Sequence, residues 1–372
     1  MSFHMRFFCC QNQGGNKMTK GEFYQTVEQF IMGMLPEKYA DCTPVVMESV
    51  NQTGTYVGLM LQSEAESQIA PVINLTRLYE EHGNKEHLEM LMAVANEVTD
   101  VYDMTDRNTM ERMQTAAIRM ASDYEYAKEH LYLTMASMAR KEVPANEPCH
   151  QIGDLQIQVR ILIAQNWIKD EGIHASIVVR DDILKKWDKT FDEVYAVAVE
   201  NTQNIVPTTI QTMGNVLNMV GIDELSDEMF DDAILIVGNK AMNQGAVNLF
   251  LPGVMEEISA KVGGSYIVLP SSVHEVIVQP LSMVGDELNE EIIADTEAMI
   301  QDVNNSQVLP EDRLSDHAYF YDADRKEFCL ASEALAVRKE AAAEYVKQEK
   351  KLQENTDDVS KKNTDTMMHP NF

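Results

Sequence analysis

The sequence is poor in positive charge and in aromatic residues. Its 372 residues include 30 Lys and Arg against 60 Asp and Glu, a formal net charge of −30, and 7% of them are aromatic. Such a chain repels DNA, RNA and anionic lipid unless its cations are clustered, and no basic stripe interleaved with aromatic residues occurs. We therefore expect no direct binding to nucleic acid or to a membrane.

Cysteine is scarce, and long hydrophobic runs are absent. The five cysteines form no C-x-x-C pair; they are Cys9, Cys10, Cys42, Cys149 and Cys329. This distribution argues against a disulfide scaffold and against a thiolate zinc site. No apolar run approaches the about 18 residues of a membrane helix, and the opening MSFHMRFFCC is too short for a signal peptide and lacks a cleavage motif. We expect a soluble, cytoplasmic protein.

Hydrophobic residues make up 45% of the chain, enough for a large core. Composition and pattern predict five segments: 1–17, a non-native or disordered extension; 18–122, an N-terminal α/β region; 123–331, the main α+β domain; 332–352, a C-terminal helix; 353–372, a disordered tail. The first boundary is a hypothesis that translation begins at Met18, because the codons of Gly14 and Gly15 can spell a ribosome-binding site.

Local patterns predict where several helices begin. Thr19-x-x-Glu22 is a capping box that opens a helix, and Thr190-x-x-Glu193 is a second one. Pro207 is expected to open the helix after that. The Ala, Glu and Lys content from residue 332 predicts a helix to about residue 352.

Other patterns predict strands. Residues 155–163 (LQIQVRILI) alternate, which predicts a strand with Gln156, Gln158 and Arg160 on an exposed face. Residues 131–138 fit a helix or a strand equally. Two apolar runs in GGSYIVLPSSVHEVIVQP, residues 263–280, predict a strand, a turn and a second strand. The fold class expected is α+β, with antiparallel-rich sheets packed by amphipathic helices and a helical C-terminal extension.

The turn between those two runs carries residue types used in catalysis. Ser271, Ser272, His274 and Glu275 lie within five residues, but in a strand starting near Val273 His274 and Glu275 would point to opposite faces. Ser272 and His274 could share a face, yet a serine nucleophile also needs an orienting acid and an oxyanion hole. The alternative interpretation is a turn with His274 as a polar residue at a sheet edge.

A metal or cofactor site has little support. Possible ligands are His274, Asp316, His317, His174 and the Cys149-His150 pair, and no H-E-x-x-H or related spacing joins them. We expect no metal and no cofactor.

The stretch Gly238-Asn-Lys-Ala-Met-Asn-Gln-Gly245 follows a predicted strand, as a nucleotide-binding loop would. It lacks the G-K-[ST] and G-x-G-x-x-G signatures of such loops. A strand-to-helix connection punctuated by glycines is the expected interpretation.

Three segments resemble a family of uncharacterised bacterial proteins of unknown function, common in clostridial and other gut Firmicutes. They are ASIVVRDDILKKWDKTFDEVYAVAVENT, GGSYIVLPSSVHEVIVQP and VLPEDRLSDHAYFYD. The likeness covers most of residues 18–330 and departs from the family between Lys141 and Gly153. A second family of unknown function, from Bacillus, is similar around Asn201 and Pro270. The resemblance implies one α+β unit and a bacterial cytoplasmic origin, and no reaction or ligand.

Two functions remain open at this point. Without a convergent catalytic set, the first hypothesis is a non-enzymatic acidic binding or regulatory protein, whose partner would be a basic or DNA-binding protein. A nucleic-acid mimic is a special form of this hypothesis and would need carboxylates in rows. The alternative is a hydrolase or metal-dependent enzyme that uses His274 with Asp316 and His317, with Ser272 as a further candidate.

Overall fold

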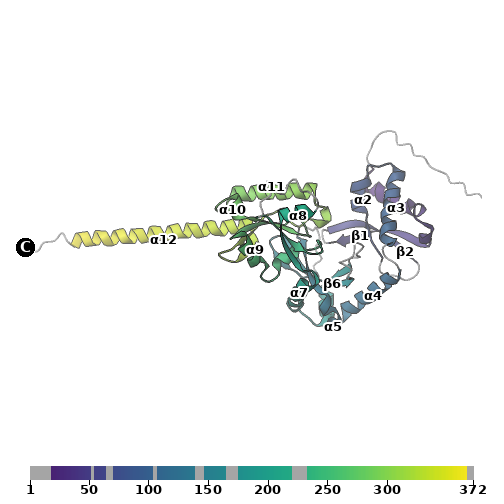
Figure 1. Cartoon of the computed structure of the whole chain (residues 1–372), viewed down its shortest axis with the longest axis horizontal. Helices are drawn as coiled ribbons and strands as arrows, with labels where there is room; N and C mark the ends of the chain where they lie inside the picture. Colours follow the sequence, from purple (N-terminus) through teal and green to yellow (C-terminus); the bar gives the residue numbers. More distant parts are fainter. Residues whose placement is uncertain are drawn as a thin grey trace, which may run out of the picture. The chain divides into compact units, whose positions relative to one another are not determined.

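The computed structural model describes residues 18–51, 54–63, 70–103, 107–138, 146–164, 175–219 and 233–366. The chain divides into two compact units, residues 1–122 with 163–176 and residues 123–162 with 177–372, and each is described by itself. Helices and antiparallel sheets occur in both units, so the α+β class is confirmed (Figure 1). Within the described ranges no helix has the length and apolar content to cross a membrane.

The first unit packs helices on a three-stranded antiparallel sheet. Its elements are α1 (Lys20–Phe30), β1 (Cys42–Asn51), β2 (Gly54–Ser63), β3 (Ile73–Asn74), α2 (Leu75–His82), α3 (His87–Asp103) and α4 (Arg107–Ser122). The Thr19–Glu22 capping box is confirmed, with the Thr19 side chain accepting from the Glu22 N–H and the Glu22 carboxylate accepting from the Thr19 N–H. Phe23, Leu59 and Val94 are fully buried in the core that joins helices to sheet.

The second unit contains two sheets. Six strands form an antiparallel sheet in the order β13-β12-β10-β11-β9-β8, and β6 pairs with β4, β5 and β7 in the other sheet. Their bounds are β4 (Leu131–Ser137), β5 (His150–Ile152), β6 (Leu155–Ala164), β7 (Ala175–Val178), β8 (Thr208–Thr212), β9 (Leu235–Asn239), β10 (Tyr266–Leu269), β11 (Val276–Pro280), β12 (Tyr319–Asp322) and β13 (Glu327–Leu330).

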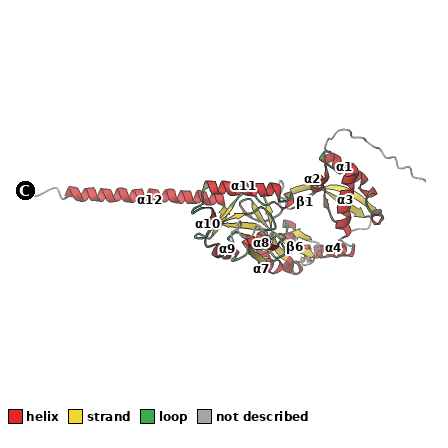
Figure 2. Ribbon diagram, turned by 45° about the horizontal axis from the view of Figure 1, so that its top comes forward, coloured by secondary structure: helices red, strands yellow, loops and turns green. Residues whose placement is uncertain are grey.

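Helices cover both sheets of this unit. They are α5 (Tyr124–Ala127), α6 (Asp181–Trp187), α7 (Phe191–Ile205), α8 (Met213–Met219), α9 (Val254–Val262), α10 (Leu281–Val284), α11 (Glu290–Ser306) and α12 (Ala331–Thr366). α7 packs on β4, and a short 3-10 turn (Ala246–Phe250) packs on β9. α11 and the first turns of α12 lie against the six-stranded sheet (Figure 2). The buried core that joins them includes Ile267, Phe320, Ile292 and Leu335.

The structure corrects or completes several local predictions. Residues 131–137 form the strand β4, which settles the helix-or-strand ambiguity. The helix predicted at Pro207 is wrong, because Pro207 precedes the edge strand β8, where the missing N–H of proline is tolerated and its carbonyl accepts from the Lys240 N–H. α12 begins at Ala331 and continues to Thr366, past the predicted end at residue 352 and into the segment predicted to be a tail.

The prediction of an exposed polar face on β6 is also wrong. Gln156 and Gln158 are 1% and 0% exposed, on the same face as Tyr132 and Ala136 of the paired strand β4, which are also buried. Alternation identifies which side chains share a face, but it cannot show that the polar face is covered by other parts of the fold.

Candidate functional site

Residues 270–273 lie beside residues 312–315 in the second unit. The Leu314 N–H donates to the Ser271 carbonyl at 3.2 Å, the Ser315 N–H donates to the Pro270 carbonyl at 3.1 Å, and the Val273 N–H donates to the Asp312 carbonyl at 2.8 Å. The two segments are antiparallel, so His274 follows the end that contacts Asp312. Asp316 and His317 follow the opposite end, beyond Pro270.

The His274 imidazole contacts two different groups with its two nitrogens. Nε2 lies 3.4 Å from Asp312 Oδ2, and Nδ1 accepts a hydrogen bond from the Gln244 N–H at 3.3 Å. The hydrogen bond to Asp312 raises the pKa of His274, and partial burial opposes that effect. Because both nitrogens are engaged, the imidazole has none available to take a proton from a hydroxyl group.

Ser272 serves the turn that precedes β11. Its side chain is buried, and its Oγ accepts from the His274 N–H at 3.0 Å, which is the hydrogen bond expected of a serine turn. Val273 to Glu275 lie before β11, which begins at Val276 and not near Val273. Burial raises the pKa of the Glu275 carboxyl, and the nearby Asp312 raises it further. Among the described residues, the only partner given for the Ser272 hydroxyl is the His274 N–H, so it contacts no group there that could act as a general base.

The loop 238–245, which begins and ends with glycine, is hydrogen-bonded to this turn. The Gly245 N–H donates to the His274 carbonyl at 2.9 Å, and a Cβ at Gly245 would lie 2.6 Å from that carbonyl and from Asn239 N. Glycine is required here because the two backbones approach so closely. The N–H groups of Ala241 and Asn243 donate to Asn239 Oδ1. Donors that a phosphate would need are thus used within the loop.

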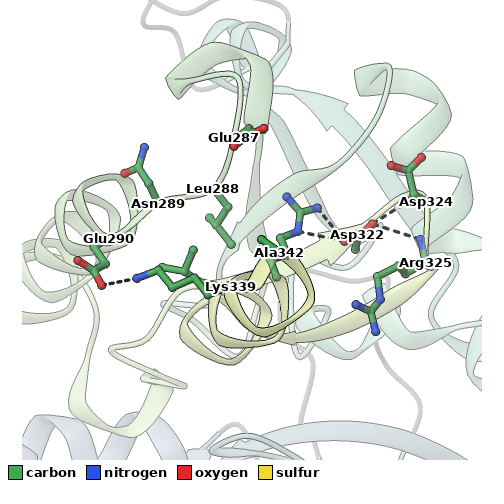
Figure 3. A pocket seen from close by; sticks show the side chains of 11 residues that line it. Glu287, Leu288, Asn289, Glu290, Asp322, Asp324, Arg325, Lys339 and Ala342 are labelled. Atoms are coloured by element: carbon green, nitrogen blue, oxygen red, sulfur yellow. Dashed lines mark hydrogen bonds and ion pairs between the residues drawn. The ribbon is translucent and has the colours of Figure 1, made fainter. Parts of the chain in front are cut away.

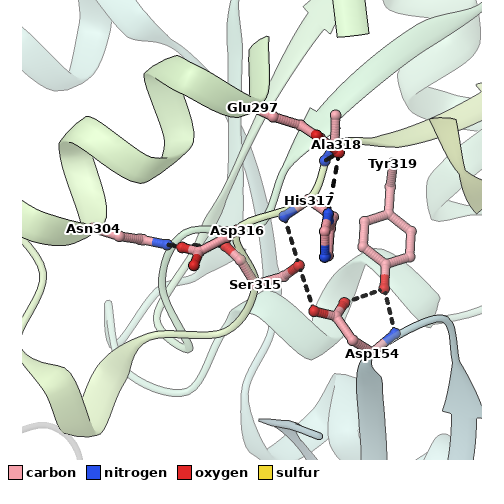
Figure 4. Close-up of polar contacts among 8 residues, drawn as sticks. All are labelled: Asp154, Glu297, Asn304, Ser315, Asp316, His317, Ala318 and Tyr319. Carbon is pink, nitrogen blue, oxygen red and sulfur yellow. Dashed lines mark hydrogen bonds and ion pairs between the residues drawn. The ribbon is translucent and has the colours of Figure 1, made fainter. Parts of the chain in front are cut away.

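Asp316 and His317 have partners of their own (Figure 4). Asp316 Oδ1 accepts from Asn304 Nδ2 at 2.7 Å, and His317 Nδ1 lies 3.2 Å from Glu297 Oε1. No contact between described residues joins His274 to either of them. The three candidates for the enzyme alternative are therefore not brought together.

The other possible metal ligands that the structure describes do not form a centre either. His150 Nε2 lies 3.7 Å from Asp192, and its ring packs on Tyr195, while Cys149 is half-buried with its thiol pKa raised by burial. His174 lies outside the described residues. Over the described ranges, no group of three or more His, Cys, Asp and Glu is placed to hold a metal ion.

A polar joint that the sequence did not indicate links the β5–β6 turn to β12 (Figure 4). The Tyr319 hydroxyl is 2.7 Å from Asp154 Oδ1 and accepts from the Asp154 N–H, while Ser315 Oγ donates to Asp154 Oδ2 at 2.9 Å. Burial raises the pKa of Tyr319. Gly153 adopts a φ of +57°, and a Cβ there would lie 2.4 Å from the Tyr319 oxygen. These partners are more than 160 residues apart, so no local motif could reveal them.

A pocket of about 700 Å³ lies where α11, α12 and the β12–β13 turn meet (Figure 3). Its cations are engaged: Arg338 with Asp322 at 2.7 Å, Lys339 with Glu290 at 2.6 Å, and Arg325 with Glu327 at 2.8 Å. Glu287 and Asp324 lie on two sides of the pocket and have no cationic partner among the described residues. The two charged groups of this pocket that have no ion-pair partner in the described chain, Glu287 and Asp324, are therefore both negative.

The negative charge continues along α11. Glu291, Asp295 and Asp302 are exposed at spacings of four and seven residues, which places them on one side of the helix. Glu290–Ser306 contains no Lys or Arg, and Met299, 53% exposed, lies among these carboxylates. We name Glu287, Glu291, Asp295 and Asp302 the α11 acidic face.

The fold and its polar contacts define a two-unit α+β protein. Its candidate catalytic side chains make hydrogen bonds and ion pairs within the second unit; they are Ser272, His274, Asp316 and His317. Residues 20–323 match the model of a family of unknown function, DUF5688. The chain belongs to this family. Neither the curated proteins nor the solved structures contain a match to it.

Proposed function

We propose that this protein is a non-enzymatic binding protein and that its α11 acidic face engages a basic protein. The observation that carries the proposal is the row of exposed carboxylates on α11, which has no Lys or Arg on the same helix and continues to Glu287, a residue with no cationic partner in the described chain. A row of this kind attracts a positively charged surface at long range and speeds its association.

The enzyme alternative has weaker support. His274 contacts Asp312 and Gln244, Asp316 contacts Asn304, and His317 contacts Glu297, so within the described chain each of the three groups proposed for a hydrolase or metal enzyme has its own, separate partners. A catalytic set needs a nucleophile, a base and its orienting group within mutual hydrogen-bond reach.

The chemistry of the α11 acidic face indicates how a partner would bind. Exposed ion pairs contribute about 0–1 kcal/mol each and weaken with salt. Met299 offers an apolar contact among the carboxylates, and methionine adapts to differently shaped partners. The proposed complex therefore forms through steering by charge, is held partly by apolar contact at Met299, and dissociates at high salt.

A matched pair of charge-neutralised proteins tests the proposal. The test variant carries Glu291→Gln, Asp295→Asn and Asp302→Asn, and the control variant carries Glu333→Gln, Glu340→Gln and Glu344→Gln on the exposed side of α12. Both lose three negative charges. We expect the wild-type protein and the control to retain the same bacterial protein at low salt and to release it at high salt, and the α11 variant to retain none. Equal retention by both variants would contradict the proposal.

The lysate for this experiment should come from a clostridial bacterium, because we also propose that the protein originates from the gut Firmicutes and is located in the cytoplasm. Support for these two points comes from the resemblance of the three sequence segments and from the few, scattered cysteines.

A further inference from the structure

In the described part of the chain, the strand β8 leaves one edge of the six-stranded sheet open. It is the last strand in the sheet order, and among the described strands it pairs with β9 and no other. The Lys240 N–H donates to the Pro207 carbonyl and the Met213 N–H donates to the Ile234 carbonyl, which fixes the alternation of the ladder. Thr209 and Gln211 are therefore bonded to β9, whereas the N–H and C=O groups of Thr208 and Ile210 point away from the sheet.

A groove of about 620 Å³ lies beside this edge, within the size range of about 300–1,000 Å³ typical of ligand sites. The apolar part of its lining comes from Val199 of α7, Ile210 of β8, and Leu251 and Val254 before and within α9, and the polar Gln203 and Thr208 also line it. Two exposed carboxylates, Glu200 and Glu257, belong to the same lining. Glu257 also contacts Lys261 at 3.7 Å, whereas Glu200 has no cationic partner among the described residues.

We propose that β8 binds an extended peptide segment of a protein partner as an added strand, with an Arg or Lys side chain of that peptide in the groove between Glu200 and Glu257. Main-chain hydrogen bonds to Thr208 and Ile210 would supply sequence-independent affinity. Alternate side chains of an added strand lie on the groove side, because side chains along a strand alternate between faces. The stem of Arg or Lys would pack on the apolar walls while its charged end meets the carboxylates.

The edge is held in place before any peptide binds. Asn248 Nδ2, in the 3-10 turn, donates to the Val206 carbonyl at 2.8 Å and to Thr208 Oγ1 at 3.0 Å. The Thr208 hydroxyl in turn donates to Gln203 Oε1 at 2.8 Å. A strand already fixed at its start loses little conformational freedom on binding, which favours association. This site is separate from the α11 acidic face and does not depend on it.

The test uses the whole protein and a synthetic heptapeptide, acetyl-TVTRTVT-amide, in which the central arginine shares a face with the two valines. We expect the peptide to slow hydrogen exchange at the Thr208 and Ile210 amides. A peptide with glutamate in place of arginine should bind about tenfold more weakly, a ratio that corresponds to about 1.4 kcal/mol. Unchanged exchange at these two amides, or equal binding of the two peptides, would overturn the proposal.

Variants separate the two parts of the site. Ile210→Pro removes an outward N–H that β9 does not use and should abolish binding, while Ile210→Val should retain it. Glu200→Gln with Glu257→Gln should remove the preference for arginine but keep the exchange protection, and this arm stands even if the proline variant fails to fold. Equal arginine preference in the double variant would exclude the carboxylates as the charge partner.

Two further outcomes are informative. The α11 variant with three neutralised carboxylates should bind the heptapeptide as the wild-type protein does, so failure of either proposal is distinguishable from failure of the other. Protection of the Thr208 and Ile210 amides that grows with protein concentration in the absence of peptide would assign the edge to a second copy of this chain and overturn the peptide proposal.

Discussion

Two polar regions inside the second unit differ in how completely their hydrogen bonds are made. Around His274 and Tyr319, side chains and backbone groups from distant segments form hydrogen bonds with one another. On the covered face of β4 and β6, Thr134 and Gln158 are 0% exposed, yet Thr134 Oγ1 and both amide atoms of Gln158 have no hydrogen-bond partner among the described residues. The hydrogen bonds of the first region stabilise the folded state, whereas the buried polar groups without partners in the second region destabilise it.

Residue type is therefore a poor guide to the role of a side chain in this protein. Residue types typical of active sites, namely serine, histidine, aspartate and tyrosine, here form the contacts that hold the turn before β11 and the β5–β6 turn in place. Glutamine and threonine, ordinary residues for a strand surface, carry the unpaired groups. A buried polar group without a partner costs about 1–3 kcal/mol, whereas one that is satisfied contributes roughly 1 kcal/mol.

The largest effect is expected from breaking the first region with Tyr319→Phe. This change removes the hydroxyl that contacts the Asp154 carboxylate and accepts from the Asp154 N–H, and leaves both groups without that partner. We expect the free energy of unfolding of the second unit to fall by about 2 kcal/mol. Urea denaturation followed by tyrosine and tryptophan fluorescence measures the loss.

Tyr321→Phe is the matched control, because Tyr321 lies in the same strand and its ring stacks on Tyr266 with centroids 4.9 Å apart. Its hydroxyl makes no hydrogen bond to the described residues, so we expect a change below about 0.5 kcal/mol. Similar losses in the two variants would show that the cost does not come from the contacts between the Tyr319 hydroxyl and Asp154.

The two regions also differ in what the sequence could predict. The turn at Pro270 to His274, the strands on either side of it and the Thr19 and Thr190 capping boxes follow from local patterns, and the structure contains them. The partners of His274 are 30 residues or more away, and Tyr319 meets Asp154 across 165 residues, so local patterns could not identify these contacts.

Burial was the other feature that the sequence could not determine. The alternation in β6 correctly groups Gln156 with Gln158, but whether that face meets solvent depends on segments distant in the chain. Pro207 is compatible with both a helix start and the first residues of an edge strand, and pairing with β9 decides between them. Free edges and grooves, such as those at β8, are equally properties of the assembled sheet.

A smaller change in the free energy of unfolding, of opposite sign, is expected when the buried polar atoms without partners are removed from the second region. Gln158→Met keeps the length of the side chain and removes the two buried amide atoms, for which the described residues supply no hydrogen-bond partner. We expect the free energy of unfolding to rise by about 1 kcal/mol, because the desolvation cost of those atoms disappears. Gln62→Met, on an exposed position of the strand β2, is the control and should change stability by less than about 0.5 kcal/mol. A loss of stability in Gln158→Met would show that the amide is satisfied in solution, by water or otherwise.

The smallest expected effect is the pH dependence that His274 gives to the first region. Its pKa is raised from 6.5 by Asp312, so the folded state binds this proton more tightly than the unfolded state does. Stability from this contact is therefore fully present below pH 6.5 and is lost as pH rises through the higher pKa of the folded state. Glu275, whose pKa is raised from 4.5 by burial, acts in the same direction at lower pH.

Two features keep the effect of His274 small. Its side chain is 30% exposed, so solvent screens the contact with Asp312, and protonation at Nδ1 would cost the hydrogen bond from the Gln244 N–H. We expect Asp312→Asn to flatten the fall in unfolding free energy between about pH 6.5 and pH 8, measured by urea titration across that window. An unchanged slope in this variant would assign the pH dependence to other groups. If His274→Ala destabilises the fold while the partner is still retained, the histidine is structural, as its two contacts imply.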